Sequence, residues 1–433
     1  MQIDIKPGMK ILESGVTAYS NEHEFTTDVD ISSTDFWYGQ SFNQRDKSFA
    51  RLRAEAPVSW HRPMQVSYPT DERGFWAVTR AADIAEASMN AEVFQSKYGI
   101  SLDAVPPFRP RASTFFLTMD APEHSRFRGL VSAAFTPKAI RRITDRIEMT
   151  ARDIVDQLVG AGDIEFVSAC SSQLPLATVS DIVGVPVSLR RRVAAAAENL
   201  AGGGQTATLP PEQRLEFIQA QWDFLHQVGA DLAAHRRAHP GEDLMTDLVQ
   251  AEIDGVRLSD DDIGEFMILM SVAGNDTTKQ TTTRAALALQ ADPAQRAWLM
   301  EDFEGRIMGA IEEFVRYASP VMHFARTAAR DTTLGGVNVS AGDKVLLLYC
   351  SGNRDESVWP SPGVFDLGRT KAPHVGFGGG GPHFCLGNGV AKTQLRAIFR
   401  ELLTRVPDVE FGEPKPLASH IFNGIEALPA YVP

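Results

Sequence analysis

The chain has 433 residues, with 42 basic and 55 acidic side chains, so its formal charge at pH 7 is −13. This negative excess argues against nonspecific binding to nucleic acid or to an anionic membrane. No apolar run is long enough to span a membrane and the first residues lack a signal-peptide pattern, so a cytoplasmic protein is expected. Three scattered cysteines argue against a disulfide framework, a structural zinc site or a four-thiolate iron–sulfur cluster.

The first elements in chain order are two strands and a helix. Within about 55–80 the strands are predicted at PVSWHRP and GFWAVTR, and the helix follows at AADIAEASM. The segment from Val93 to Met119 reads as irregular and is a candidate lid. No linker, charge block or repeat interrupts the sequence, so one domain spanning 1–433 is expected.

The middle of the chain, about 120–330, is predicted to form a helical core. Gly and Pro break it at AGGGQTATLPPEQ and at HPGED, and strands return in TTLGGVNVSAGDKVLLLYC. After Cys385, apolar residues recur at helical spacing, which predicts a helix that ends before Pro407. The expected fold class is mainly α with smaller β-sheets.

A long helical pattern, LSDDDIGEFMILMSVAGNDTTKQTTTRAALAL, breaks local rules in its interior. Ser259 is a suitable N-cap, but Gly274 in mid-helix costs about 1 kcal/mol relative to alanine. Asp276, Thr277 and Thr278 compete with the backbone for hydrogen bonds. Such violations are frequent at functional sites, although a tolerated kink with solvent-facing polar groups is the alternative.

The spacing Glu-x-x-Arg occurs at Glu313 and Arg316 and again at Glu123 and Arg126. Residues three apart share one helical face and can form an ion pair. Taken alone, either match is explained by a surface pair that contributes little to stability.

The loop HVGFGGGGPHFCLGNGVAK, 374–392, places Cys385 just before a predicted helix. Backbone N–H groups and the helix dipole favour a thiolate there, and glycines let several N–H groups approach the sulfur. A thiolate can ligate a metal, whereas a buried structural thiol is the alternative interpretation.

This loop resembles the haem-binding loop of the cytochrome P450 family, which has the form Phe-Gly-x-Gly-x-His/Arg-x-Cys-x-Gly. Gly381, His383, Cys385 and Gly387 fit the pattern. Phe377 lies eight residues before the cysteine instead of seven, so the loop carries one extra glycine. A longer loop of this kind resembles that of some bacterial sterol and lipid hydroxylases in the family.

The resemblance implies the cytochrome P450 fold, with haem b between the long central helix and the loop. Cys385 would be the iron ligand, with Phe377 and Gly387 among the residues around the cofactor. Glu313 and Arg316 would form the structural pair that locks the core beneath the haem, because they precede the cysteine at about the family's distance. No bound flavin or nucleotide is expected.

The stretch AGNDTT resembles the family's oxygen-binding groove. Ala273 and Gly274 would be the small residues that make room beside the haem. Asp276 and Thr277 would be the acid–alcohol pair that relays protons.

Two buried propionates would need cationic partners, preferably arginine. His124 and Arg128 lie four apart in MDAPEHSRFRGLVSAAFTP, which resembles the family's haem-clamping helix. Arg326 resembles its strand donor to a propionate, and His383 completes the set.

The resemblance implies a monooxygenase that inserts one atom of O2 into a C–H bond. Electrons would come from a ferredoxin and its reductase, because no flavin or nucleotide domain is visible. Arg141, Arg142 and Lys392 are candidates for a basic patch that receives an acidic ferredoxin, although a solvated face explains each one singly. A monomer is expected.

Other classes of function are less consistent with these motifs. A thiol enzyme with Cys385 as nucleophile and His383 as base would leave Glu313, Asp276 and Arg326 unexplained. A haem sensor would have no evident need for the acid–alcohol pair. A peroxide-driven enzyme is a further alternative, but Asp276 and Thr277 favour the route through oxygen and electrons.

The resemblance implies a distal pocket surrounded by mostly apolar residues and hence a hydrophobic substrate, although an ordinary core position explains each residue singly. These residues are Phe115, Phe116, Leu269, Val272, Val321, Met322 and Phe324. The motifs favour a sterol side chain, a terpenoid or a branched lipid, with a tailoring oxidase of a secondary metabolite as the alternative.

Overall fold

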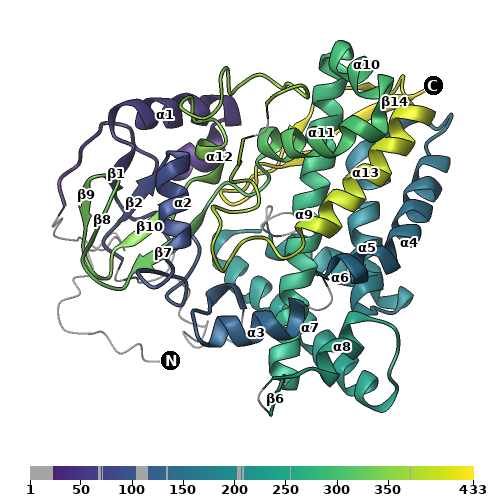
Figure 1. The fold of residues 1–433 in the computed structure, drawn as a ribbon, viewed down its shortest axis with the longest axis horizontal. Helices are drawn as coiled ribbons and strands as arrows, with labels where there is room; N and C mark the ends of the chain where they lie inside the picture. The colour runs from purple at the N-terminus through teal and green to yellow at the C-terminus, as the bar shows by residue number, and fades with distance from the viewer. Residues whose placement is uncertain are drawn as a thin grey trace.

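The structure is a computed structural model, and it describes residues 23–66, 70, 72–103, 116–132, 135–201, 206, 209–253, 255–370 and 372–433. A sheet-rich part lies on one side of the molecule and the longer helices pack on the other (Figure 1). The helices are α1 Phe42–Glu55, α2 Ala81–Met89, α3 Glu123–Ser132, α4 Pro137–Asp156, α5 Gln173–Val183, α6 Val187–Leu200, α7 Pro211–Ala238, α8 Leu244–Gln250, α9 Asp260–Ala291, α10 Pro293–Glu301, α11 Phe303–Ala318, α12 Tyr349–Gly352 and α13 Asn388–Arg405. Shorter helical turns occur at Asp35–Gly39, Phe116–Thr118 and Val167–Ser171.

The largest sheet has five strands in the order β1-β2-β10-β7-β3. Its strands are β1 Val58–His61, β2 Phe75–Val78, β3 Phe94–Gln95, β7 Phe324–Ala328 and β10 Lys344–Leu347. Only the β2–β10 pair is parallel, and the other neighbours are antiparallel. The strands predicted at PVSWHRP, GFWAVTR and DKVLLL are confirmed, as is the helix α2 that follows β2.

The remaining strands form small sheets. They are β4 Gly162–Glu165, β5 Glu252–Ile253, β6 Val256–Arg257, β8 Thr332–Leu334, β9 Val337–Val339, β11 Glu410–Phe411, β12 Lys415–Pro416, β13 Ile425–Ala427 and β14 Pro429–Val432. Strand β14 pairs with the nearby β11 and with β4, which lies more than 260 residues earlier in the chain. Runs this short have no readable alternation, so the strands after Pro407 were not predictable from periodicity.

Helix α9 crosses the helical part of the molecule and packs against α5, α6, α7 and α11 (Figure 1). Ser259 caps it through a reciprocal bond with Asp262: the serine hydroxyl accepts from the Asp262 N–H, and the aspartate accepts from the Ser259 N–H. Neighbouring helices surround α9, so most of its residues are buried. The helix predicted over this segment is confirmed.

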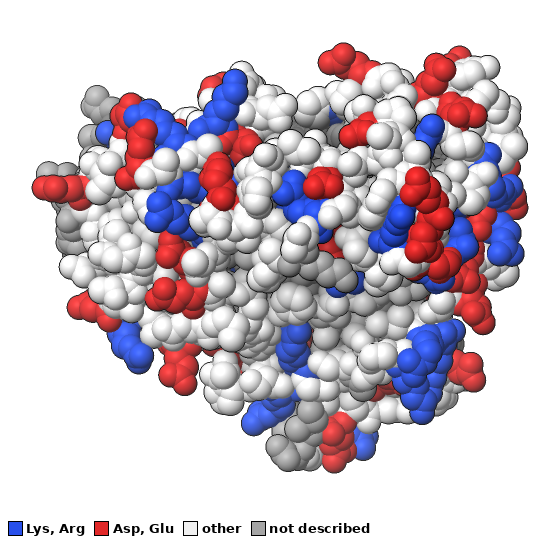
Figure 2. Space-filling model, turned by 45° about the horizontal axis from the view of Figure 1, so that its top comes forward, with Lys and Arg blue, Asp and Glu red and all other residues white. Residues whose placement is uncertain are grey.

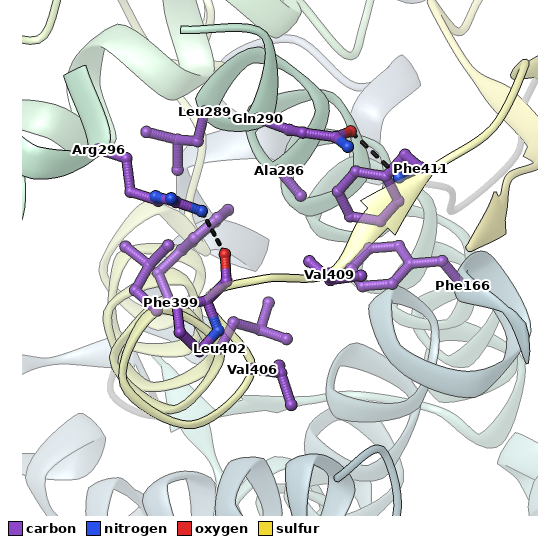
Figure 3. A pocket seen from close by; sticks show the side chains of 12 residues that line it. Phe166, Ala286, Leu289, Gln290, Arg296, Phe399, Leu402, Val406, Val409 and Phe411 are labelled. Carbon is purple, nitrogen blue, oxygen red and sulfur yellow. Dashed lines mark hydrogen bonds between the residues drawn. The ribbon is translucent and has the colours of Figure 1, made fainter. Parts of the chain in front are cut away.

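Helix α13 begins three residues after Cys385 and ends two residues before Pro407, as its periodicity predicts. Its apolar residues pack with α4, α9 and α11 in one core cluster, which includes Leu395, Ile398 and Phe399. A cavity of about 30 Å³ remains between α9, α13 and β11 (Figure 3). The cavity is about the size of one water molecule, and none of the predicted site residues lines it.

Acidic and basic side chains are interspersed over much of the face seen in Figure 2, although several Lys and Arg side chains gather at one side of it. Among the helices of the described residues, none is long and apolar enough to cross a membrane.

Candidate active site

Cys385 lies in a turn whose backbone is held on both sides. Its N–H donates to the carbonyl oxygen of Phe377 at 3.0 Å, and its own carbonyl accepts from Asn388 Nδ2 at 2.7 Å. The N–H of Gly378 in turn donates to the carbonyl of Val375 at 3.0 Å. The loop backbone therefore fixes where the thiol points.

The four consecutive glycines explain how the longer loop fits against α2. Gly378, Gly380 and Gly381 have φ of +98°, +95° and +72°, a region that side chains disfavour. A Cβ on Gly381 would lie 2.2 Å from the carbonyl oxygen of Ser88, and one on Gly379 would lie 2.4 Å from Ser88 Oγ. The extra glycine thus belongs to a segment in which the loop touches the end of a helix.

Burial raises the pKa of the Cys385 thiol above its usual range, although the N–H groups of Gly387 and Asn388 and the positive charge of Arg128 act in the opposite direction. The expected thiolate is therefore not a property of the loop alone. A metal cation bound to the sulfur would deprotonate it outright.

The other two cysteines are fully buried. Burial raises the pKa of the Cys350 thiol to about 12 and also raises the pKa of the Cys170 thiol. Of the three, Cys385 alone is partly exposed, so it is the one placed for chemistry.

His124 on α3, His383 in the loop and Arg326 on β7 converge beside Cys385. The two imidazole rings lie 4.2 Å apart, centroid to centroid. Burial, followed by the charge of Arg128, lowers the pKa of His124 to about 4. Burial, followed by the charge of Arg326, lowers the pKa of His383 to about 2. Burial is thus the main cause of both shifts, and nearby guanidinium charges add to it.

Two of these residues have incomplete partners: one imidazole nitrogen makes no hydrogen bond, and one guanidinium has no described carboxylate. His124 Nε2 is buried without a hydrogen-bond partner. Arg326 is 5% exposed and donates to the neighbouring carbonyl of Ala325 at 2.7 Å, and no described carboxylate forms an ion pair with it. An anion with several acceptor oxygens would satisfy both, so the residues fit the propionates of haem.

Arg128 has a different set of contacts. Its guanidinium donates to the loop carbonyls of Pro382 and Phe384, both at 2.7 Å. It therefore braces the loop on either side of His383. The spacing of four residues predicted that Arg128 lies on the same helical face as His124, but it could not predict the hydrogen bonds to the loop carbonyls.

Helix α9 has an accessible stripe in its otherwise largely buried middle. Ala273 is exposed although it lies in the middle of a largely buried helix, and Thr277, one turn later, is partly exposed. Thr277 Oγ1 donates to the carbonyl oxygen of Ala273 at 2.9 Å, whereas Thr278 is buried. A small residue and a hydroxyl thus share one accessible stripe.

Gly274 has a packing role that the sequence did not indicate. A Cβ at this position would lie 2.5 Å from Cγ2 of Val179 on α5. The glycine therefore lets α5 and α9 approach closely, and that contact accounts for its place in mid-helix.

Asp276 is 2% exposed and forms an ion pair with Lys279, with Oδ1 2.5 Å from Nζ. Lys279 Nζ also lies 3.7 Å from Oε1 of Glu198 on α6. Burial lowers the pKa of Lys279, but Asp276 and then Glu198 outweigh it, so the net direction is upward. Sequence reasoning missed Lys279, although its i+3 spacing from Asp276 was a usable signal.

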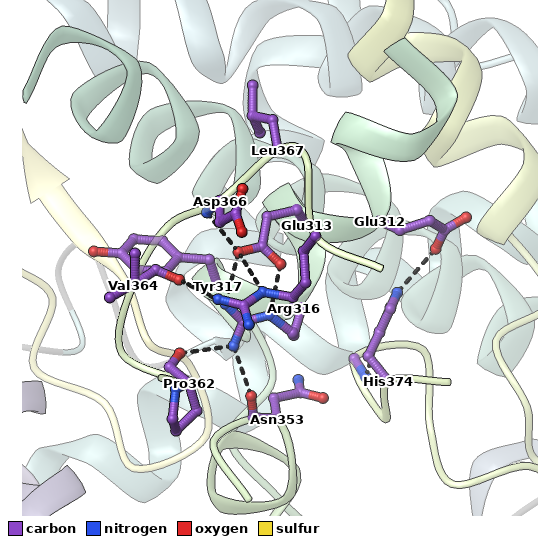
Figure 4. A network of polar contacts seen from close by, with 12 residues as sticks. Glu312, Glu313, Arg316, Tyr317, Asn353, Pro362, Val364, Asp366, Leu367 and His374 are labelled. Atoms are coloured by element: carbon purple, nitrogen blue, oxygen red, sulfur yellow. Dashed lines mark hydrogen bonds and ion pairs between the residues drawn. The ribbon is translucent and has the colours of Figure 1, made fainter. Parts of the chain in front are cut away.

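Glu313 and Arg316 form a buried bidentate pair on α11, with N···O distances of 2.6 and 2.7 Å (Figure 4). Their exposed fractions are 5% and 1%. Arg316 also donates to the carbonyls of Asn353 and Pro362, both at 2.8 Å. Glu313 accepts from the N–H of Asp366 at 3.0 Å. The pair thus fastens α11 to two distant loop segments.

The residues predicted to line the substrate pocket divide into three groups. Val272, Val321 and Phe324 are partly exposed. Phe116 and Leu269 are buried in the cluster formed mainly by α5 to α9, where Phe116 stacks on His124. Met322 is fully buried in a cluster with Trp37 and Phe49, as an ordinary core residue. Phe115 lies outside the described residues.

The basic residues predicted near the thiol have unequal surroundings. Arg141 and Arg142 are exposed on α4, and the adjacent Ile140 reaches the loop: a Cβ on Gly389 would lie 2.6 Å from its Cδ1. Lys392 instead pairs with Glu312 at 2.6 Å and is partly buried. Of these three residues, Arg141 and Arg142 on α4 therefore carry the exposed charge.

Glu312 also accepts from His374 Nε2 at 2.9 Å (Figure 4). These residues line a groove of about 590 Å³ beside the loop, together with the partly exposed side chains of Met308 and Phe384.

A thiol before a helix, a buried arginine without a described carboxylate partner and an accessible stripe on a central helix together fit a haem-thiolate protein. Residues 209–407 match the family model "Cytochrome P450". The chain is 38% identical to the methyl-branched lipid omega-hydroxylase of Mycobacterium tuberculosis over 413 residues, which cover 93% of this chain and 94% of that protein. It is 34% identical to the steroid C26-monooxygenase of Mycolicibacterium smegmatis over 390 residues, 88% of each. The chain belongs to the cytochrome P450 family.

A solved structure agrees with this assignment. Cytochrome P450 CYP268A2 of Mycobacterium marinum, in complex with pseudoionone, superposes with a TM-score of 0.89 at 47% identity, covering 95% of this chain and 100% of that one. The protein is therefore a haem b monooxygenase with the mainly helical P450 fold, as its motifs predicted.

Proposed function

We propose that this monooxygenase hydroxylates the branched apolar end of a lipid, terpenoid or sterol side chain, with electrons supplied by a ferredoxin and its reductase. The observation that carries the proposal is similarity along nearly the whole chain to enzymes named for methyl-branched lipids and for the steroid C26 position. The apolar, partly exposed side chains of Val272, Val321 and Phe324 suit such a substrate. We also propose that residues 1–433 form one domain.

Cys385 would hold the haem iron, and bound haem would supply the activation of O2 needed to place one oxygen atom in a C–H bond and release the other as water. Arg326, His124 and His383 would hold the propionates: Arg326 has no described carboxylate partner, His124 Nε2 has no hydrogen-bond partner, and the His383 ring lies 4.2 Å from that of His124. Arg128 would act one step away, by bracing the loop through the carbonyls of Pro382 and Phe384.

Thr277 and Asp276 would deliver protons to the reacting oxygen. The Thr277 hydroxyl is on the open stripe of α9, where its oxygen can accept a proton and its O–H can donate one. Asp276 lies one residue earlier and is buried, so it would exchange protons through water or side-chain motion. Ala273 would leave space beside Thr277.

Replacing Thr277 by alanine tests this proton path. Thr277→Ala should keep normal haem content and consume reductant, but release more hydrogen peroxide and less product per electron pair, because the hydroxyl is absent. Thr278→Ala is the matched control, since it removes the same group about 100° around the helix at a buried position. Equal product yield per electron pair in Thr277→Ala and the parent enzyme would exclude Thr277 from proton delivery.

The substrate class is tested by titrating the purified holoenzyme and following the spin-state shift of the haem band. A methyl-branched fatty acid and a sterol with a full side chain should bind more tightly than an unbranched acid of equal carbon number and a sterol without the side chain. Equal affinity for branched and unbranched ligands would reject the proposed preference.

A further inference from the structure

Lys279 is a buried amine that is shared by two carboxylates from different helices. It is 8% exposed, and its ammonium lies 2.5 Å from Asp276 Oδ1 on α9 and 3.7 Å from Glu198 Oε1 on α6. A long basic side chain in the middle of a buried helix is unusual, because burying a charge is costly unless it is paired. The placement therefore needs a specific reason.

The two contacts are not equivalent. Asp276 is 2% exposed and at hydrogen-bond distance, so its interaction with Lys279 is little screened. The side chain of Glu198 is 50% exposed and lies beyond hydrogen-bond distance, which is typical of a weak pair. Asp276 is thus the principal partner of the ammonium, and Glu198 is a secondary one.

The ion pair also orients Asp276. One carboxylate oxygen, Oδ1, is held by Lys279, whereas the other, Oδ2, is buried without a hydrogen-bond partner. Because the carboxylate group is rigid, an ion pair at one oxygen also fixes the position of the other oxygen. Oδ2 is then the carboxylate oxygen that is left without a described partner.

We propose that Lys279 is a positioning residue for proton delivery: it orients Asp276 through Oδ1, so that Oδ2 serves the relay. The inference rests on the proposed role of Asp276 and Thr277. It adds a residue that touches neither substrate nor cofactor and acts only through the carboxylate.

The test compares variants of the full-length holoenzyme at equal haem content. The parent reaction uses O2, one electron pair and two protons to convert substrate C–H into C–OH plus water. The unproductive reaction uses the same inputs to make hydrogen peroxide. Lys279→Met should lower the product formed per electron pair about tenfold, as is usual when a residue that orients a functional group is removed, with peroxide rising in compensation.

Two further variants separate positioning from packing. Lys279→Arg should restore most of the coupling, because the guanidinium can also bind Oδ1. Arg257→Met is the matched control, since it removes the cation from an exposed pair with Glu252 and should leave coupling unchanged. Melting temperature and substrate-induced spectral shifts report any general loss of structure.

Glu198→Gln separates the two partners of Lys279. Coupling should stay at the parent level or rise, because the ammonium is then left to Asp276. A loss as large as that of Lys279→Met would overturn the proposal, since the link to α6 would carry the effect. Full coupling in Lys279→Met would also overturn it.

Failure of the positioning role can be distinguished from failure of the proposed proton path itself. If Thr277→Ala and Asp276→Asn uncouple the reaction while Lys279→Met does not, only the positioning role is wrong. If Thr277→Ala and Asp276→Asn also leave the reaction coupled, the relay is wrong, and Lys279 has nothing to position.

Discussion

The two Glu-x-x-Arg matches in this chain differ in burial, and burial decides how much an ion pair at each would contribute to the stability of the fold. Glu123 and Arg126 are exposed on α3. Glu313 and Arg316 are buried, bidentate and joined to loop carbonyls and an N–H. An exposed pair contributes little to stability, whereas breaking a buried pair leaves a charge without compensation.

Glu313→Ala should therefore lower the free energy of unfolding by about 3–5 kcal/mol and reduce haem content, because Arg316 would keep its buried charge without a carboxylate. Urea unfolding and haem quantification measure both effects. Glu123→Ala is the control, with an expected loss below about 1 kcal/mol from the first turn of a helix. Equal stability of the two variants would contradict the role given to the buried pair.

The cysteine loop and helix α2 form a contact that shapes both elements. Gly379, Gly380 and Gly381 approach Ser88 and Met89 so closely that a Cβ would collide with them. Gly378 also has a positive φ, but a Cβ there would meet no atom closer than 3.8 Å, an ordinary contact distance. Backbone conformation alone therefore does not account for the run of glycines.

Gly381→Ala should destabilise the protein more than Gly378→Ala does, since both variants strain a positive φ but only the first meets the backbone of Ser88. The strain alone costs about 1–2 kcal/mol. The collision should add to that cost and move the loop, so Gly381→Ala should also lose haem more readily. Thermal unfolding and haem transfer to an acceptor protein measure the difference, and identical values would show that α2 does not constrain the loop.

At the scale of the whole molecule, the net charge of −13 conceals a local positive surface. Arg141 and Arg142 are exposed beside Ile140, which reaches the start of α13 near the thiol. Lys392, the third predicted member, is held by Glu312. We therefore propose that α4 supplies the main attraction for an acidic ferredoxin.

Arg142→Glu should raise KM for a ferredoxin about fivefold at low ionic strength while leaving substrate affinity unchanged, because opposite charges steer association. The effect should shrink as salt is added. Lys47→Glu makes the same charge change on α1, at the far side of the molecule, and should have little effect (Figure 1). Equal responses of the two variants would mean that only net charge matters.

The sequence by itself predicted what depends on local chemistry. The paired strands around Trp60 and Trp76, the helix after Cys385 and the membership of the cytochrome P450 family all follow from periodicity, glycine and proline positions, or short motifs, and all are confirmed. The spacing of Glu313 and Arg316 likewise predicted their contact, because residues three apart on a helix are neighbours.

Only the tertiary structure decided what depends on segments far apart in the chain. It directs Arg128 to the loop carbonyls, packs Gly274 on Val179 and places Met322 in the core. It also brings Glu198 of α6 to Lys279 of α9. The local sequence around a residue is compatible with contacts to several different distant residues. Which of these contacts forms depends on which helices and loops pack together.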